Sequence, residues 1–229
     1  MVSAVILAGG KGERMNAPGV DKCFLALGSR PVIVWSLLAF ENCPDVDQVV
    51  LVVRKEQIGP AKVLKTMFGL SKLVQVVAGG KSRQESVKAG LNAVDPDTRL
   101  VVIHDGARPC VRPRLISACI ETARHNGGAV AAAPVTDTLK RSTKNQAIEA
   151  TVDRTGLWTV QTPQAFKYDQ ILSAYRKVTA RKLTVTDDAS AMETAGLPVK
   201  LCEWTEPNIK ITYPADLALA AAILQLAPR

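Results

Sequence analysis

Residues 7–15 read LAGGKGERM, and this stretch decides the fold. The residues that lead into it, Val2–Ala8, are almost all apolar, which is typical of a strand buried on both faces of a parallel sheet. Three glycines interspersed with Lys11, Glu13 and Arg14 follow at once. Ligands of open α/β sheets bind beyond the carboxyl ends of the strands, where glycines let backbone N–H groups approach a phosphate. A tight turn without a ligand is the alternative, but the two cations in the loop favour an anion-binding site.

The rest of the chain repeats the alternation of strand and helix that this opening begins. Strand-like apolar runs are expected at Ala4–Ala8, Val49–Val53, Leu73–Ala78, Leu100–His104 and Ala129–Ala133. Helical periodicity is expected at Val32–Phe40, Pro60–Phe68, Ser82–Val94 and Arg114–Asn126. This order predicts a Rossmann-like α/β fold, with a doubly wound, mainly parallel sheet flanked by helices.

Local signals mark several helix ends. The stretch Ser82–Glu85 has the spacing of a capping box, so a helix should begin there. Gly127 follows the helix that ends at Asn126 and tolerates a left-handed cap. Pro214 is expected to open a final helix rich in Ala and Leu.

Residues from about Thr138 to Thr159 break the alternation. A polar turn at 140–145 separates two short β-like runs, which predicts a protruding hairpin. A lone hairpin is marginally stable in water, so this arm is expected to pack on something such as a second subunit. The alternative is a loose surface excursion; Trp158 and its apolar neighbours favour packing. The chain is thus expected to form one domain, 1–229, with an arm for dimerisation at about 138–159.

Composition narrows the classes of function. The 29 Lys and Arg residues exceed the 21 Asp and Glu residues by 8, and this positive charge attracts anions such as nucleotides. There is no long basic run and no nucleic-acid-binding signature, so nucleic acid is not expected as a partner. The five cysteines are scattered without a C-x-x-C pair, which argues against zinc and predicts reduced thiols in the cytoplasm. No apolar run is long enough to predict a membrane span.

Two common nucleotide fingerprints are absent from the glycine loop. Met15 stands where a dinucleotide-binding loop has its third glycine, and Arg54 stands where that fold has the acid that holds a ribose. A Walker loop requires Gly-Lys-Ser/Thr, but Glu13 follows Gly12. An NAD(P) oxidoreductase is therefore disfavoured.

Eight motifs in order identify a family. They are LAGGKGERM with Lys22 shortly after, GGKSRQESV (79–87), HDGARP (104–109), DTLKR (137–141), TVDRTGLW (151–158), QTPQAF (161–166), TDDASAME (186–193) and NIKIT (208–212). Together they resemble the 2-C-methyl-D-erythritol 4-phosphate cytidylyltransferases (IspD family) of the non-mevalonate isoprenoid pathway. The resemblance covers essentially the whole chain. It implies a nucleotidyltransferase fold, a homodimer with a β-arm, and Mg²⁺ as cofactor.

The resemblance also implies a reaction: the phosphate of methylerythritol phosphate attacks the α-phosphorus of CTP, giving 4-diphosphocytidyl-2-C-methyl-D-erythritol and pyrophosphate. By this resemblance Arg14 and Lys22 stabilise charge on the triphosphate, and Arg154 and Lys210 hold the methylerythritol phosphate, with hydroxyl contacts from Thr138 and Thr162. The residues implied to line the nucleotide are Ala8, Gly9, Gly10, Gly12, Gly80, Arg83 and Ser86. A plain helical serine is the alternative for Ser86, and Ser82 is interpreted as a helix cap.

Carboxylates supply the metal prediction. Asp105 directly follows a strand, and Mg²⁺ takes few carboxylates alongside phosphate oxygens and water, so Asp105 is the expected ligand rather than a turn residue. His104 is expected to be a packed strand-end residue. Asp187 and Asp188 suggest a second metal site, but an N-cap with acids near the helix start is preferred.

The chain departs from the family pattern at a few positions. Asp21 precedes Lys22 where a proline is usual, and a pairing between them would weaken the phosphate contact of Lys22. Gly106 stands where the family usually has alanine. Two other functions stay open: a ribitol 5-phosphate cytidylyltransferase and a non-catalytic nucleotide-binding regulator. The presence of Arg14, Lys22 and Asp105 argues against the regulator.

Overall fold

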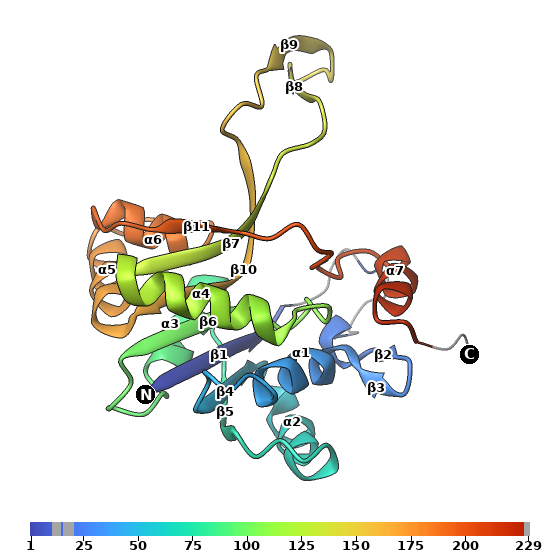
Figure 1. Cartoon of the computed structure of the whole chain (residues 1–229), viewed down its shortest axis with the longest axis vertical. Coiled ribbons are helices and arrows are strands. Elements are labelled where there is room, and N and C mark those ends of the chain that lie inside the picture. The colour runs from blue at the N-terminus through green and yellow to red at the C-terminus, as the bar shows by residue number, and fades with distance from the viewer. Residues whose placement is uncertain (11–14, 16–20, 227–229) are drawn as a thin grey trace.

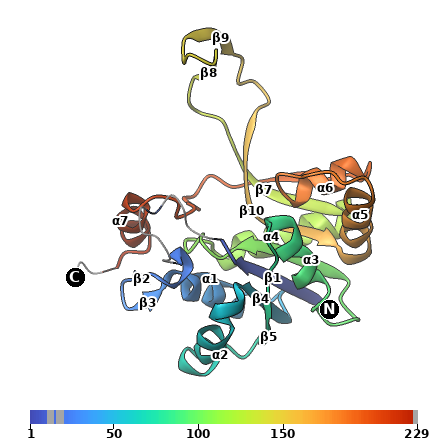
Figure 2. The ribbon, with the colours of Figure 1, turned by 180° about the vertical axis from the view of Figure 1, so that it is seen from behind.

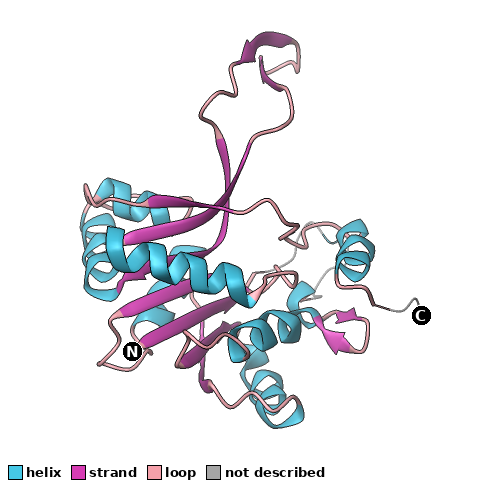
Figure 3. Cartoon of the chain, in the orientation of Figure 1, coloured by secondary structure: helices cyan, strands magenta, loops and turns pink. Residues whose placement is uncertain are grey.

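A seven-stranded sheet forms the centre of the molecule (Figure 1; Figure 3). The computed structural model describes residues 1–10, 15 and 21–226. The sheet has the strand order β11-β7-β10-β6-β1-β4-β5. Its strands are β1 (Val2–Ala8), β4 (Gln48–Val53), β5 (Leu73–Ala78), β6 (Leu100–Asp105), β7 (Gly128–Pro134), β10 (Trp158–Lys167) and β11 (Lys200–Glu203). The parallel pairs β6-β1, β1-β4 and β4-β5 bring the carboxyl ends of four strands to one edge.

The five strands expected from the sequence are all present, as is the mainly parallel α/β architecture. β10 was not predicted, and it runs antiparallel to both of its neighbours, β6 and β7. Its sequence alternates weakly and contains Pro163, a residue that argues against a central strand. The register of β10 shifts between Val160 and Gln164, and this irregularity accommodates the proline.

Helices cover both faces of the sheet, as a doubly wound fold requires. The helices are α1 (Val32–Glu41), α2 (Ile58–Met67), α3 (Arg83–Leu91), α4 (Pro113–Asn126), α5 (Tyr168–Ala180), α6 (Asp188–Thr194) and α7 (Ala215–Ile223). One core cluster packs α1, α2 and α4 against the sheet, and a second packs α3, α5 and α6 against the other face (Figure 2). The strands are buried on both sides, which explains their unbroken apolar sequences.

The helix-end signals mark helix ends in the structure, although the capping box at Ser82–Glu85 is only half formed, because Glu85 Oε2 accepts from Lys81 N at 2.7 Å. Ser82 caps α3, and its side chain accepts a hydrogen bond from Glu85 N at 3.1 Å. Gly127 ends α4 with φ +90°, and Pro214 lies at the start of α7. The described cysteines are free and buried. Within the described part of the chain, no helix has both the length and the apolar character needed to cross a membrane.

The predicted hairpin is a long arm that projects away from the sheet (Figure 1). β8 (Leu139–Ser142) and β9 (Ile148–Val152) pair antiparallel at its end, while β7 leads into the arm and β10 leads back out. The arm side chains are largely solvent-exposed, and Ile148 is 69% exposed. An exposed apolar side chain on a two-stranded hairpin agrees with an arm that packs on another surface.

The segment between β11 and α7 runs along the carboxyl edge of the sheet. α7 packs with the short hairpin β2 (Ala26–Leu27) and β3 (Arg30–Pro31) in a third apolar cluster that includes Met15 and Ile211. Ile211 N donates to Ala107 O at 2.8 Å, so residues 208–212 lie beside the loop that follows β6. This path places Lys210 at the carboxyl edge of the sheet.

Candidate active site

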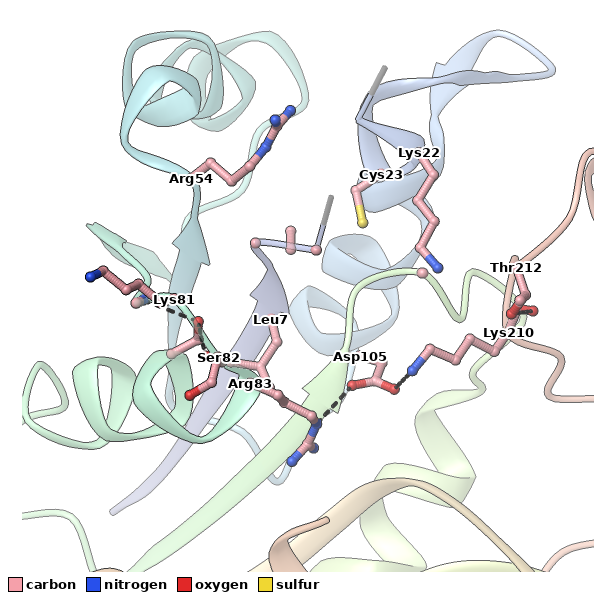
Figure 4. Close-up of a pocket in the computed structure, with 16 residues that line it drawn as sticks. Leu7, Lys22, Cys23, Arg54, Lys81, Ser82, Arg83, Asp105, Lys210 and Thr212 are labelled. Atoms are coloured by element: carbon pink, nitrogen blue, oxygen red, sulfur yellow. Dashed lines mark hydrogen bonds and ion pairs between the residues drawn. The ribbon is translucent and has the colours of Figure 1, made fainter. Parts of the chain in front are cut away.

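A pocket of about 650 Å³ lies at the carboxyl ends of β1, β4 and β6 (Figure 4). The pocket is lined by Leu7, Ala8, Gly9, Gly10, Lys22, Cys23, Arg54, Gly80, Lys81, Ser82, Arg83, Ser86, Asp105, Ala107, Lys210 and Thr212. Backbone from two glycine turns forms part of its wall, and cationic side chains surround a single described carboxylate, that of Asp105. Such a lining favours a ligand with several phosphate groups.

Asp105 lies at the end of β6 between two cations. Lys210 Nζ donates to Asp105 Oδ2 at 2.6 Å, and Arg83 Nε lies 3.6 Å from Asp105 Oδ1 (Figure 4). Burial of this carboxyl raises its pKa, but the charges of Lys210 and Arg83 outweigh burial and hold the pKa below its ordinary value. Asp105 is therefore an anion throughout the neutral pH range.

Arg83 begins α3 and reaches across to α6. Its Nη1 and Nη2 donate to the two oxygens of Asp188 at 3.1 and 2.6 Å, a bidentate pair. Tyr175 on α5 donates its hydroxyl to Asp188 Oδ1 at 2.6 Å. Asp188 is fully buried, so it is more than an acid near a helix start, although the expected N-cap is present at Asp187.

His104 is buried behind Asp105, as expected for a packed strand-end residue. Its ring lies 5.2 Å from the Phe40 ring, and burial lowers its pKa to about 3. Thr162 Oγ1 accepts from Asp105 N at 3.0 Å and lies 3.1 Å from His104 Nδ1. A neutral, enclosed imidazole is not available as a general base at neutral pH. Thr162 instead joins β10 to the backbone of Asp105.

The second glycine turn, at Gly79–Gly80, depends on Ser86. Ser86 Oγ accepts from Gly80 N at 3.2 Å and donates to Ser82 O at 3.0 Å. A Cβ at Gly80 would lie 2.3 Å from Glu85 Cβ, so a side chain there would collide with α3. Ser86 is buried and is not a plain surface serine; its hydroxyl shapes the turn that lines the pocket.

Lys22 opens a short 3₁₀ helix (Lys22–Phe24) on the opposite wall. Its Nζ donates to Ile211 O at 2.7 Å, next to Lys210. The neighbouring Asp21 accepts from Cys23 N at 3.0 Å and pairs with Arg54 Nε at 3.3 Å. The Asp21 carboxylate is thus paired with Arg54, which also lines the pocket.

The structure brings together most of the residues expected at the site. The pocket contains Ala8, Gly9, Gly10, Lys22, Gly80, Arg83, Ser86, Asp105 and Lys210. Thr138 and Arg154 do not line it: both are exposed in the arm, where Arg154 Nη1 donates to Thr136 O. Gly12 and Arg14 lie outside the described residues. Sequence reasoning did not select Arg54, Lys81 or Thr212; their only signal was a position just after a strand or within a quoted motif.

The donor set suits a metal that relies on its substrate for most ligands. Among the described residues, no group of three or more His, Cys, Asp and Glu side chains is placed to hold a metal ion. Mg²⁺ commonly uses one or two carboxylates together with substrate phosphates and water. Asp105, an anion in a pocket whose other described charged side chains are all cationic, fits that pattern.

Sequence comparison decides the family. The model of the family described as "IspD: 2-C-methyl-D-erythritol 4-phosphate cytidylyltransferase" matches residues 2–226. The chain belongs to the IspD family. Two curated relatives carry the name 2-C-methyl-D-erythritol 4-phosphate cytidylyltransferase and are each 42% identical. The one from Dehalococcoides mccartyi aligns over 98% of this chain and 96% of its own length, and the one from Clostridium novyi over 97% and 96%.

Solved IspD-like structures share the fold along the whole chain. The 4-diphosphocytidyl-2C-methyl-D-erythritol synthase from Anaerococcus prevotii superposes with a TM-score of 0.84 at 30% identity, covering 98% of this chain and 96% of that one. The 2-C-methyl-D-erythritol 4-phosphate cytidylyltransferase from Thermus thermophilus superposes with a TM-score of 0.80 at 32% identity, covering 97% and 98%. The expected fold and family are confirmed.

Proposed function

We propose that this chain transfers the cytidylyl group of CTP to 2-C-methyl-D-erythritol 4-phosphate. A phosphate oxygen of the acceptor forms a bond to the α-phosphorus of CTP. The bond from that phosphorus to the bridging oxygen breaks, and pyrophosphate leaves with the bonding electrons. The products are 4-diphosphocytidyl-2-C-methyl-D-erythritol and pyrophosphate. Membership of the IspD family supports the reaction.

The arrangement around Asp105 is the observation that carries the proposal. Lys22, Lys210 and Arg83 surround one carboxylate in a pocket with two glycine turns. Two phosphate-bearing substrates repel each other, and positioned cations offset this repulsion. No covalent nucleophile is required for such a transfer, and the buried neutral His104 agrees with a mechanism based on positioning.

The reaction gives the glycine turns and the lysines of the pocket separate tasks. Backbone groups of Gly9, Gly10 and Gly80 approach the nucleotide closely, because no side chain intervenes. Lys22 and Lys210 neutralise charge on the phosphates as it shifts towards the leaving pyrophosphate. Arg14, which precedes them in the glycine loop, is proposed to do the same.

Asp105 is proposed to hold Mg²⁺. Asp105 would hold the ion, and the ion would supply further charge neutralisation for the phosphates. Asp105 is the described carboxylate that the pocket offers for this purpose.

The acceptor site is proposed to include the arm of a second subunit. Arg154 and Thr138 lie on the arm, away from Asp105 of the same chain. If two copies exchange arms in a homodimer, Arg154 and Thr138 of each would complete the other's site beside Lys210. We accordingly propose a single domain, 1–229, whose arm at about 138–159 forms the dimer in the cytoplasm.

Pyrophosphate release with Mg²⁺, CTP and methylerythritol phosphate tests the function. Parallel reactions replace the acceptor with ribitol 5-phosphate, or CTP with the other nucleoside triphosphates. Release only with CTP and methylerythritol phosphate supports the proposal. Release with ribitol 5-phosphate would overturn the acceptor, and binding of CTP without release under any condition would indicate a nucleotide-binding regulator.

A further inference from the structure

Arg83 lies between two carboxylates and makes shorter contacts with Asp188 than with Asp105. Both of its Nη groups are within hydrogen-bond distance of Asp188, whereas its Nε lies 3.6 Å from Asp105 Oδ1, longer than a hydrogen bond. The strongest contact to Asp105 comes from Lys210, on the other oxygen. The contact of Arg83 with Asp105 is therefore a longer ion pair through Nε, while both Nη groups are bound to Asp188.

Asp188 is fixed in place by burial and by further hydrogen bonds. It is 0% exposed, and Tyr175, itself 1% exposed, donates a further hydrogen bond to its Oδ1. Gln164 Oε1 accepts from the N–H groups of Asp188 and Ala189 at 3.1 and 3.0 Å, which fixes the start of α6 on strand β10. These contacts fix the position of the buried Asp188 carboxylate. The bidentate pair then fixes the position of the Arg83 guanidinium.

The consequence concerns the charge that Asp105 presents to the pocket. A guanidinium carries five N–H donors in a planar fork that suits bidentate pairing with a carboxylate. If Asp188 had no charge, Asp105 would be the nearest remaining carboxylate, and the fork would turn towards it. A short hydrogen-bonded Arg83–Asp105 pair would then occupy Oδ1, the oxygen that Lys210 does not bind and that a divalent cation could use.

We propose that Asp188 is a positioning residue, which holds the Nη groups of Arg83 away from a bidentate pair with Asp105 and so keeps Asp105 Oδ1 available to a divalent cation. This inference rests on the proposed function, since it presumes that Asp105 binds the metal. It gives α6 a role in the reaction although no residue of α6 lines the pocket.

Asp188→Asn tests the proposal with Mn²⁺ as the probe. Mn²⁺ is titrated into wild type and variant at saturating CTP without acceptor, and protein-bound ion is measured by water-proton relaxation enhancement against a blank of CTP alone. We expect the dissociation constant for Mn²⁺ to rise roughly 10-fold in the variant, the size of a lost charge-assisted interaction. Activity lost by this variant should be recovered at high Mg²⁺. An unchanged dissociation constant would overturn the proposal.

Tyr175→Phe is the matched control. This change removes a buried hydrogen bond to the same carboxylate but leaves its charge. It should lower the unfolding temperature while the dissociation constant for Mn²⁺ stays within about 2-fold of wild type. If Tyr175→Phe weakens Mn²⁺ as much as Asp188→Asn does, the effect is general loosening around α6 and the proposal is wrong.

A measurement on the wild-type protein avoids any dependence on how Asp188→Asn folds. In protein labelled with ¹⁵N-arginine, the bidentate pair should slow rotation of the Arg83 guanidinium and give separate Nη–H signals, assigned with Arg83→Lys. The signals should persist when Mg²⁺ and CTP are added. Their collapse on addition would show that Arg83 leaves Asp188, and would overturn the proposal. The ligand-free spectrum reports on the Asp188 contact alone, whereas absence of Mn²⁺ binding to wild type with CTP would overturn the proposed function.

Discussion

Lys210 and Asp105 are in contact at 2.6 Å, although they are 105 residues apart in the chain. The contact requires the segment after β11 to return across the carboxyl edge of the sheet, where Ile211 bonds the loop after β6. The charge of Lys210 lowers the electrostatic cost of burying Asp105. Lys210 thus lies where phosphate charge is expected during the reaction.

Replacing Lys210 tests its contribution to the reaction. Lys210→Met retains much of the side-chain volume and removes the charge, so we expect kcat/KM to fall about 100-fold or more, as for other groups that stabilise developing charge. Steady-state pyrophosphate release provides the measurement. Lys62→Met, on the exposed face of α2, is the control and should retain wild-type activity. A loss as small as that of the control would exclude Lys210 from charge stabilisation.

The ionisation of Asp105 makes the unfolding free energy of the protein depend on pH in the acid range. Its folded pKa lies below the unfolded value of about 3.9, so its ionic contacts stabilise the protein above that value and are lost as pH falls through the folded pKa. Asp105→Asn should cost about 1–3 kcal/mol of unfolding free energy at pH 7, because Lys210 and Arg83 lose a partner. The difference from wild type should shrink below about pH 4. Urea unfolding at pH 7 and 3.5 measures it, and an equal difference at both pH values would contradict the assignment.

His104 is expected to remain neutral wherever the enzyme works. Its folded pKa of about 3 lies below the unfolded value of about 6.5, so between them the unfolded chain binds more protons and stability falls as pH is lowered. The chain has two histidines, so His125→Gln leaves one imidazole for an NMR titration. The His104 ring signals should not shift between pH 8 and 5. A midpoint near pH 6.5 would show that the ring is exposed to solvent.

Mixing two inactive variants tests whether the arm is exchanged. Arg154→Gln and Lys210→Met should each lose activity, the first at the acceptor site. If Arg154 serves the partner's pocket, a mixed dimer has one site with both residues intact and one with neither. Random reassortment of equal amounts then restores about one quarter of wild-type activity. No recovery after confirmed subunit exchange would place Arg154 in the site of its own chain.

Gly106 and Ile33 form a pair that the family's usual alanine does not predict. A Cβ at position 106 would lie 2.3 Å from Ile33 Cδ1, so Gly106→Ala should cost roughly 1–3 kcal/mol through overpacking. Ile33→Val removes that methyl group. The double variant should be more stable than the sum of the single changes predicts, as measured by urea unfolding. If the two changes in unfolding free energy simply add, the contact with the Ile33 methyl group is not the source of the cost of Gly106→Ala.

Much of this site was predictable because its parts are local. Glycine turns directly after strands, a carboxylate at the end of β6 and a capping serine at α3 each follow from a few neighbouring residues. The motif order added Lys22 and Lys210, which no periodicity would select.

What escaped prediction depends on distant residues or an irregular strand. Arg83 was expected at the nucleotide, yet its Nη groups face Asp188, 105 residues away; nothing in either local sequence indicates this pairing. β10 was missed because Pro163 interrupts its pattern. The roles of all the site residues stay predictions, those of Lys22, Asp105 and Lys210 as well as those of Arg14, Arg154 and Thr138.

Strand β10 also limits how the arm can vary in length. It emerges from the arm and then places Thr162 against Asp105 and Gln164 against the start of α6. Because the register of β10 already shifts between Val160 and Gln164, one residue inserted or deleted there would displace Thr162 from Asp105 or Gln164 from α6. Insertions and deletions should therefore be tolerated at the arm tip, at residues 143–147, and be absent from its β10 base. A change in arm length there would inactivate the pocket even if the arm still met its partner.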